Sequence, residues 1–173
     1  MIGPAETRDA TGLLSLRREV LGEGQWFITE AQELRGGLDA EIPRVRELSR
    51  SDNSLYLVAR DEGLVVGFLV CTGGSLRRLR HTAKLEVMVR AAYRGKGIGS
   101  ALLDEAIAWL DGHATVEKLG LAVFDDNERA IALYAARGFR EEGRRPCEYR
   151  FEDGSYRGDV LMYRYRGGDT GIR

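Results

Sequence analysis

The sequence predicts an α/β protein built on one mixed, mostly antiparallel sheet of six to seven strands that is flanked by about four helices. Strand-like apolar stretches occur both in hairpin pairs and singly between helices. The patterns follow the order strand, two helices, three strands, helix, strand, helix and two strands. Neither a β-sandwich nor a helical bundle has that order.

The N-terminal half of the chain shows patterns for a strand, two helices and a hairpin. They cover Ile2–Ala5, Ala10–Val20, Leu38–Leu48, and the strand pair Ser54–Arg60 and Leu64–Cys71. The alternation of Leu55, Leu57 and Ala59 indicates a strand with one buried face. Pro43 falls inside the second helix, and we place it in the first turn, where a backbone N–H has no partner within the helix and its absence costs nothing. The apolar patch Trp26–Thr29 has no assigned state.

The C-terminal half alternates strands and helices. The expected elements are a strand Ala83–Arg90, a helix Gly97–Leu110, a strand Lys118–Phe124, a helix Asn127–Arg137, and a hairpin of Arg144–Phe151 with Asp159–Arg166. The first of these helices has the clearest apolar stripe, formed by Ile98, Ala101, Leu102, Ala106 and Trp109. Residues 125–127 supply capping chemistry for the second helix, and Gly138 ends it.

Composition excludes several classes of protein. The chain has 173 residues with no repeat or linker, so we expect a single domain over 1–173 with a short flexible tail. Lys and Arg number 26 against 27 Asp and Glu, and this balance provides no positive field for nucleic acid or an anionic membrane. Two distant cysteines exclude a disulfide framework and a cysteine zinc cage, and no metal is expected. No signal peptide or spanning segment is visible, so we expect a cytoplasmic protein.

A glycine-rich loop is the sharpest local feature. It joins a strand to a helix and consists of Arg94, Gly95, Lys96, Gly97, Ile98, Gly99 and Ser100. Glycines let main-chain N–H groups approach a ligand, and the first turn of a helix has free N–H groups and a positive dipole end. No Ser, Thr, Asp or Asn stands just before Gly97 to cap this helix. A phosphate or pyrophosphate is therefore the expected acceptor, and a plain strand-to-helix connection is the alternative.

Two familiar phosphate loops do not fit this segment. A Walker A loop needs Ser or Thr directly after Gly-Lys, and Gly97 follows Lys96. The dinucleotide fingerprint GxGxxG fails because Gly99 comes one residue early when counted from Gly95. A nucleotide-binding α/β module is therefore disfavoured.

Two segments together resemble the GCN5-related N-acetyltransferase (GNAT) family. Val87, Met88 and Val89 followed by the loop 94–100 match its acetyl-CoA signature, (Gln/Arg)-x-x-Gly-x-(Gly/Ala). Residues 121–139, which include Asn127 and Tyr134, look like the family's fifth strand and fourth helix. The residues Trp26–Glu30 and Tyr156–Met162 further resemble a bacterial subgroup that acetylates small molecules and amino acids.

The resemblance implies a fold and a cofactor site. The strand with Val87–Val89 should bulge and splay away from its central neighbour, Leu121–Val123, and the pantetheine arm of acetyl-CoA would lie in the gap. An N–H near Val89 would face the thioester carbonyl, and the loop Arg94–Ser100 would hold the pyrophosphate. Asn127 would contact the cofactor, and Tyr134 would reach the sulfur as a general acid. The alternative for Tyr134 is a core aromatic residue.

Glu86 is the candidate base for the acceptor amine. It stands among apolar residues on the strand expected at the acetyl group, where desolvation raises a carboxyl pKa. Glu86 stands an odd number of residues from Val87 and Val89, so its side chain is expected on the opposite face of the strand. An ordered water chain is the alternative base. Some relatives that modify protein N-termini have a glutamate five residues before the asparagine, where this chain has Ala122.

These features favour an acetyl-CoA-dependent N-acetyltransferase that moves an acetyl group to a primary amine of a small molecule by direct attack in a ternary complex. The alternatives are a protein or peptide N-acetyltransferase and a non-catalytic acyl-CoA-binding sensor. A homodimer is implied by the family alone. The basic run Arg77, Arg78 and Arg80 is typical of a solvated loop, and it is also a candidate to bind an acceptor carboxylate or the cofactor's 3′-phosphate.

Overall fold

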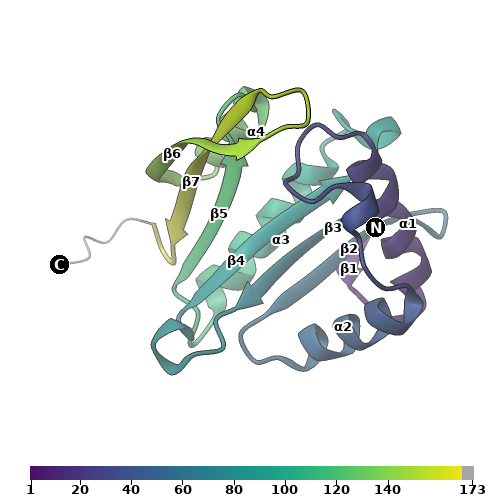
Figure 1. Ribbon diagram of the computed structural model, residues 1–173. Coiled ribbons are helices and arrows are strands. Elements are labelled where there is room, and N and C mark those ends of the chain that lie inside the picture. Colours follow the sequence, from purple (N-terminus) through teal and green to yellow (C-terminus); the bar gives the residue numbers. More distant parts are fainter. Residues whose placement is uncertain (169–173) are drawn as a thin grey trace.

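The computed structural model describes residues 1–168 and contains one seven-stranded sheet in the order β1-β2-β3-β4-β5-β7-β6 (Figure 1). All neighbours are antiparallel except the parallel pair β4 and β5. The strands are β1 Ile2–Pro4, β2 Leu55–Asp61, β3 Leu64–Gly73, β4 Thr82–Val89, β5 Lys118–Phe124, β6 Arg140–Arg150 and β7 Tyr156–Tyr165. The α-helices are α1 Ala10–Gly22, α2 Leu38–Arg50, α3 Ile98–Gly112 and α4 Glu128–Ala135. The predicted fold class and element order are confirmed.

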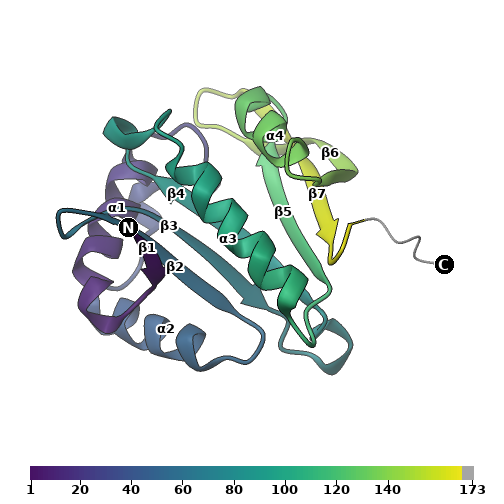
Figure 2. The same cartoon turned by 180° about the vertical axis from the view of Figure 1, so that it is seen from behind.

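Helices cover both faces of the sheet. Figure 1 shows α1 and α2 on one face, and Figure 2 shows α3 across the other. Buried side chains of α1 and α2 pack with Val58 and Phe68, whereas Leu102 and Leu110 of α3 pack with Leu57. The prediction that β2 buries only one face is therefore wrong, because each face of this central strand meets a helical layer.

The strands β4 and β5 separate in the middle of the sheet. Their register contains only the three pairs from Thr82 and Lys118 to Lys84 and Gly120, and the two ribbons then diverge (Figure 1). The splayed central pair is thus confirmed. The expected bulge at Val87–Val89 is wrong, because β4 pairs with β3 without a register shift up to Val89. Strand β5 likewise pairs with β7 over its whole length. The two halves of the sheet therefore separate between β4 and β5 without a bulge in either strand.

Two helices differ in detail from the prediction. Pro43 lies in the second turn of α2, which begins at Leu38, so the helix lacks the bond that residue 43 would donate. In α3 the buried stripe is Leu102, Leu103, Ala106 and Leu110, whereas Ala101 is exposed. Helix α4 follows the prediction: Asn127 caps it by accepting the N–H of Ala130 at 3.1 Å, and Gly138 follows it at a φ of 79°.

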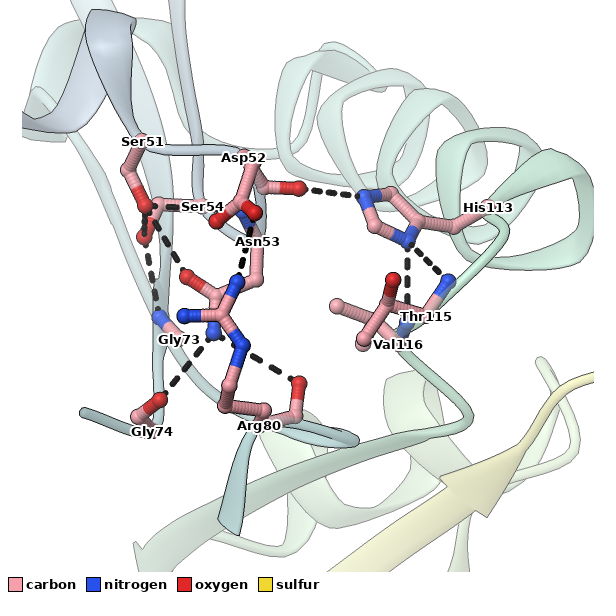
Figure 3. Close-up of polar contacts among 10 residues, drawn as sticks. All are labelled: Ser51, Asp52, Asn53, Ser54, Gly73, Gly74, Arg80, His113, Thr115 and Val116. Atoms are coloured by element: carbon pink, nitrogen blue, oxygen red, sulfur yellow. Dashed lines mark hydrogen bonds and ion pairs between the residues drawn. The ribbon is translucent and has the colours of Figure 1, made fainter. Parts of the chain in front are cut away.

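Polar groups fasten the end of the molecule where β4 and β5 still pair (Figure 3). The Asn53 amide donates to the carbonyl oxygens of Gly74 at 3.1 Å and Arg80 at 3.5 Å. Nδ1 of His113 accepts the N–H groups of Thr115 at 3.0 Å and Val116 at 2.8 Å. Its Nε2 lies 3.0 Å from the carbonyl oxygen of Asp52 and carries the proton, because Nδ1 is occupied as an acceptor. The bond between His113 and Asp52 ties the end of α3 to the loop before β2, and the Asn53 bonds tie that loop to the connection between β3 and β4.

The predicted C-terminal tail falls on residues 169–173, outside the described part of the chain. Within residues 1–168, none of the helices is both long and apolar enough to cross a membrane.

We expect His113→Ala to lower the free energy of unfolding by about 1 to 2 kcal/mol, because two N–H groups and one carbonyl oxygen lose their partner. Urea unfolding followed by circular dichroism measures this loss. His81→Ala is the matched control: His81 is exposed, and within residues 1–168 its side chain makes no polar contact, so its stability should change by less than about 0.5 kcal/mol. Equal stabilities for the two variants would contradict the role of His113.

Candidate active site

A cavity of about 1090 Å³ opens where β4 and β5 diverge. Its walls come from both strands, from the glycine loop, from α4, and from the connection between α1 and α2. The cavity brings together every predicted site residue except one, namely Glu86, Val87, Met88, Val89, Arg94, Gly95, Gly97, Ile98, Gly99, Ser100, Asn127 and Tyr134. The exception is Lys96, an exposed residue whose ammonium lies 4.9 Å from the ring centre of Tyr93.

The edge of β4 offers main-chain groups to this cavity. The N–H of Arg90 bonds to Val66 in β3 at 2.9 Å, so the polar groups of the alternate residues Val87 and Val89 point away from β3, toward the gap. The Val89 carbonyl oxygen accepts a bond from Arg94 Nε at 2.9 Å. The N–H groups of Val87 and Val89 therefore face a space that no strand fills.

The glycine loop presents a helix N-terminus to the same space. Gly95 and Gly97 adopt φ values of 77° and 83°, which favour glycine. Gly97 is the N-cap of α3 and, as predicted, no side chain among residues 1–168 caps this helix. The first helical bond runs from Ala101 N–H to the Gly97 carbonyl at 2.9 Å, so the amides of residues 98–100 precede the hydrogen-bonded turns.

Of the two arginines beside the loop, Arg94 forms an ion pair and Arg129 faces the cavity. Arg94 donates to both carboxylate oxygens of Glu23 at 2.6 and 2.8 Å, so its guanidinium braces the loop against the end of α1. Arg129 lines the cavity, and its Nη2 lies 3.8 Å from the position of a Cβ on Gly95. Arg129 is not among the residues predicted from the sequence, although its place two residues after Asn127, in the first turn of α4, was a usable signal.

Tyr134 closes the apolar side of the cavity. Only 8% of this residue is exposed, and its ring centre lies 5.8 Å from that of Phe139. Burial raises the pKa of the Tyr134 hydroxyl to about 12, so the group keeps its proton at neutral pH. The hydroxyl has no hydrogen-bond partner within residues 1–168 and is free to donate to a ligand.

Glu86 points toward α1 and α2, the face that its parity indicates. The prediction that Glu86 stands among apolar residues is wrong, because Nη1 of Arg17 donates to Glu86 Oε1 at 2.7 Å. The Arg17 side chain is 6% exposed, whereas that of Glu86 is 35% exposed. The carboxylate of Glu86 is thus exposed to solvent in the cavity, and the buried guanidinium of Arg17 fixes the orientation of this carboxylate.

Arg17 belongs to a buried network on that face. Its Nη2 donates to the Tyr56 hydroxyl at 3.3 Å, Tyr56 donates to Glu41 at 3.0 Å, and the guanidinium carbon lies 4.3 Å from the ring centre of Phe68. Burial alone would lower the pKa of Arg17, but Glu86, Tyr56 and Glu41 outweigh it and raise that pKa. Burial also raises the pKa of the Tyr56 hydroxyl and is the largest cause of that shift.

The β6–β7 hairpin completes the wall opposite Glu86. Buried Asp159 accepts bonds from Arg145 at 2.9 Å and from the Tyr149 hydroxyl at 2.8 Å. Burial would raise the pKa of Asp159, but these two partners lower it. Arg157 donates to the Gln25 carbonyl at 2.8 Å and lies over the Trp26 ring at 5.9 Å, so the hairpin meets the α1–α2 connection.

A model of the acetyltransferase (GNAT) family matches residues 23–139. The chain belongs to this family. Among curated proteins it is 34% identical over 110 residues to the L-amino acid N-acetyltransferase AaaT of Escherichia coli, and 36% identical over 110 residues to the N-alpha-acetyltransferase RimI of Mycobacterium tuberculosis. These matches cover 64% and 61% of this chain. They span 67% of AaaT and 63% of RimI, but only 28% of a longer Mycobacterium leprae relative.

Solved structures share the whole fold. A GNAT-family acetyltransferase of Streptococcus pneumoniae superposes with a TM-score of 0.91 at 27% identity, over 96% of this chain and 99% of that one. The phosphinothricin acetyltransferase of Sinorhizobium meliloti, solved in complex with acetyl-CoA, has the same fold with a TM-score of 0.84 at 23% identity, over 99% and 91% of the chains.

We expect Arg17→Gln to lower the free energy of unfolding by about 3 kcal/mol, because buried Glu41 and partly buried Glu86 lose their cation. Chemical unfolding measures the change. The neighbouring Arg18 is exposed and has no ion pair within residues 1–168, so Arg18→Gln should stay close to the wild type. If both variants lost the same stability, the Arg17 network would not be what stabilises this face.

Proposed function

We propose that the protein is an acetyl-CoA-dependent N-acetyltransferase that acetylates a primary amine of a small molecule in a ternary complex. One observation carries the proposal: the unpaired edge of β4, the uncapped N-terminus of α3 and the hydroxyl of Tyr134 all face one cavity. Peptide-like groups, a pyrophosphate and a thioester sulfur are the ligand groups that such surfaces match. Acetyl-CoA contains all three.

The residues present fit this cosubstrate at each point. The N–H groups of Val87 and Val89 would bond to the pantetheine amides as an added strand would. The amides of residues 98–100 would hold the pyrophosphate, and Arg129 would add a positive charge beside it. The side-chain oxygen of Asn127 already caps α4, which leaves its amide nitrogen for the cofactor. Lys96 is exposed and does not line the cavity, and its contact with the cofactor stays a prediction from the sequence.

Acetyl-CoA supplies the acetyl thioester, and the chain supplies the proton transfers. Glu86 would bind the acceptor ammonium and accept its proton, directly or through water, because its partly exposed carboxylate is held in the cavity wall by Arg17. The Val89 N–H would stabilise negative charge on the acetyl oxygen. Tyr134, which keeps its proton at neutral pH, would donate it to the departing sulfur.

The two curated relatives favour different acceptors. AaaT is named for L-amino acids and RimI for α-amines of proteins, so a peptide acceptor is the second candidate. Ala122 replaces the glutamate that some N-terminal acetyltransferases have at this place, which favours the small molecule. The retained hydroxyl of Tyr134 favours an enzyme over a non-catalytic acyl-CoA sensor.

The cytoplasm is the compartment that we propose. Cys71 is buried and Cys147 exposed, both as free thiols, which suits a reducing environment. We propose a homodimer on the family resemblance alone, and gel filtration with light scattering tests it.

A thiol-release assay tests the function. The protein would be mixed with acetyl-CoA and a panel of amino acids, polyamines, aminoglycosides and N-terminal peptides, and free CoA would be measured. Release that depends on a small amine supports the proposal. Release with peptides alone favours the second candidate, and tight binding of acetyl-CoA without release with any amine favours the sensor.

We expect Gly97→Asn to weaken acetyl-CoA binding at least about tenfold, equivalent to about 1.4 kcal/mol. Asparagine tolerates the φ of 83°, and a Cβ there meets no protein atom within 4 Å, so the fold should persist while the side chain enters the phosphate space. Calorimetric titration gives the affinity. Gly63→Asn is the matched control, since Gly63 has a φ of 84° and equal free space in the β2–β3 turn. Unchanged affinity in a folded Gly97→Asn protein would refute phosphate binding by the loop.

Tyr134→Phe retains the buried ring and removes only the hydroxyl. If this group protonates the sulfur, kcat should fall on the order of 10²-fold while KM for acetyl-CoA stays nearly constant. Steady-state and single-turnover rates measure the effect on the chemical step. Tyr163→Phe on β7, outside the cavity, should retain the wild-type rate. A wild-type single-turnover rate for Tyr134→Phe would make this residue a packing aromatic.

A further inference from the structure

Within residues 1–168, Arg44 is a cation without an ion-pair partner in the wall of the cavity. It lies on α2, is half-buried and lines the cavity. Its Nε is buried and has no hydrogen-bond partner, and within residues 1–168 none of its nitrogens forms an ion pair. A guanidinium carries five donors, and withdrawing one of them from water without a partner is unfavourable. Such a group is available to bind an anionic ligand group.

The helix places Arg44 beside the Glu86 network. Arg44 stands three residues after Glu41, so the two side chains lie on one face of α2. Glu41 does not neutralise Arg44, because it accepts the Tyr56 hydroxyl and lies 3.9 Å from Arg17. Arg17 in turn donates to Glu86. Arg44 therefore lies within one helical turn of Glu41, which contacts Arg17, the ion-pair partner of Glu86.

Most of the other charged residues that line the cavity form ion pairs within the protein. Arg17, Arg94, Glu86 and Asp159 each have an ion-pair partner in the protein. Within residues 1–168, the two cavity cations without one are Arg129 and Arg44. Arg129 lies beside Gly95 in the loop proposed for the pyrophosphate. Arg44 lies on α2, the helix that packs against α1, on the face of the sheet where Glu86 points.

We propose that Arg44 binds a carboxylate of the acceptor, so that the preferred substrate is a free amino acid whose amine meets Glu86 and whose carboxylate meets Arg44. This inference rests on the proposed function. A guanidinium binds a carboxylate through two parallel N–H bonds. The apolar residues Trp26, Phe27, Ile28 and Leu34, from the connection between α1 and α2, also line the cavity and would contact the acceptor side chain.

The proposal separates the two acceptor classes. A peptide N-terminus has a neutral amide where the free amino acid has its carboxylate, and an amide would leave the charge of Arg44 uncompensated. The basic run Arg77, Arg78 and Arg80, which the sequence offered for a carboxylate, does not line the cavity. Arg80 pairs instead with Asp52 at the end where β4 and β5 still pair.

The test compares Arg44→Gln with Arg46→Gln across three matched acceptor sets: L-amino acids, their carboxamides and the corresponding alkylamines. Arg46 is an exposed residue of the same helix that does not line the cavity. The wild type should acetylate the best free amino acid with a kcat/KM at least about 10²-fold above that of its carboxamide. Arg44→Gln should lose about 10²-fold on the acid, mostly through KM, and little on the amide. The affinity for acetyl-CoA should not change, and Arg46→Gln should match the wild type.

A second readout does not depend on turnover. Calorimetric titration of the free amino acid into the protein saturated with CoA should show binding that Arg44→Gln weakens by a similar factor and that the carboxamide does not reproduce. Equal loss on acid and amide, or a wild type that does not distinguish them, would overturn the carboxylate site. Transfer to alkylamines or peptides alone would refute this inference and leave acetyl transfer intact. No transfer to any amine, with acetyl-CoA bound, would refute the proposed function as well.

Discussion

The separation of β4 from β5 is the constraint on which the rest of the structure depends. A sheet normally pairs every main-chain N–H and C=O of its inner strands, and here a central strand leaves one edge open after three register pairs. The opening persists because each strand is held from outside, β4 by β3 and β5 by β7 along their full lengths. The open edge lies within a cavity, so it does not present itself to a second chain.

Ion pairs stabilise the walls of this opening and determine which groups remain free for ligands. Arg94 joins the glycine loop to the end of α1, and Arg17 joins β4 to α1 and α2. On the opposite wall, Arg145 neutralises Asp159. Because these charges are satisfied within the protein, they set geometry more than they attract ligands. Among the cavity residues within 1–168, the guanidiniums of Arg129 and Arg44 have no ion-pair partner and so remain available to anionic groups of a ligand.

The predictable and the unpredictable parts of the site differ in their range along the chain. Gly97 and Asn127 were identified because turn and capping chemistry is local, and the structure gives both the expected conformations. The neighbours of Glu86 were not, because Arg17 stands 69 residues earlier and no local pattern announces that contact. Arg44 was also not identified, because its surroundings on α2 indicate only an amphipathic helix.

The sequence by itself determined the order and type of the elements, the glycines of the loop before α3 and the residues of the family signatures, since each depends on periodicity or on a few consecutive residues. Only the tertiary structure decided that β2 is buried on both faces, that β4 separates without a bulge, and that Arg94 braces the loop. It also decided which arginines stay free. The physical reason is that strand pairing, helix packing and charge neutralisation join residues far apart in the chain, and their partners are set by the folded geometry.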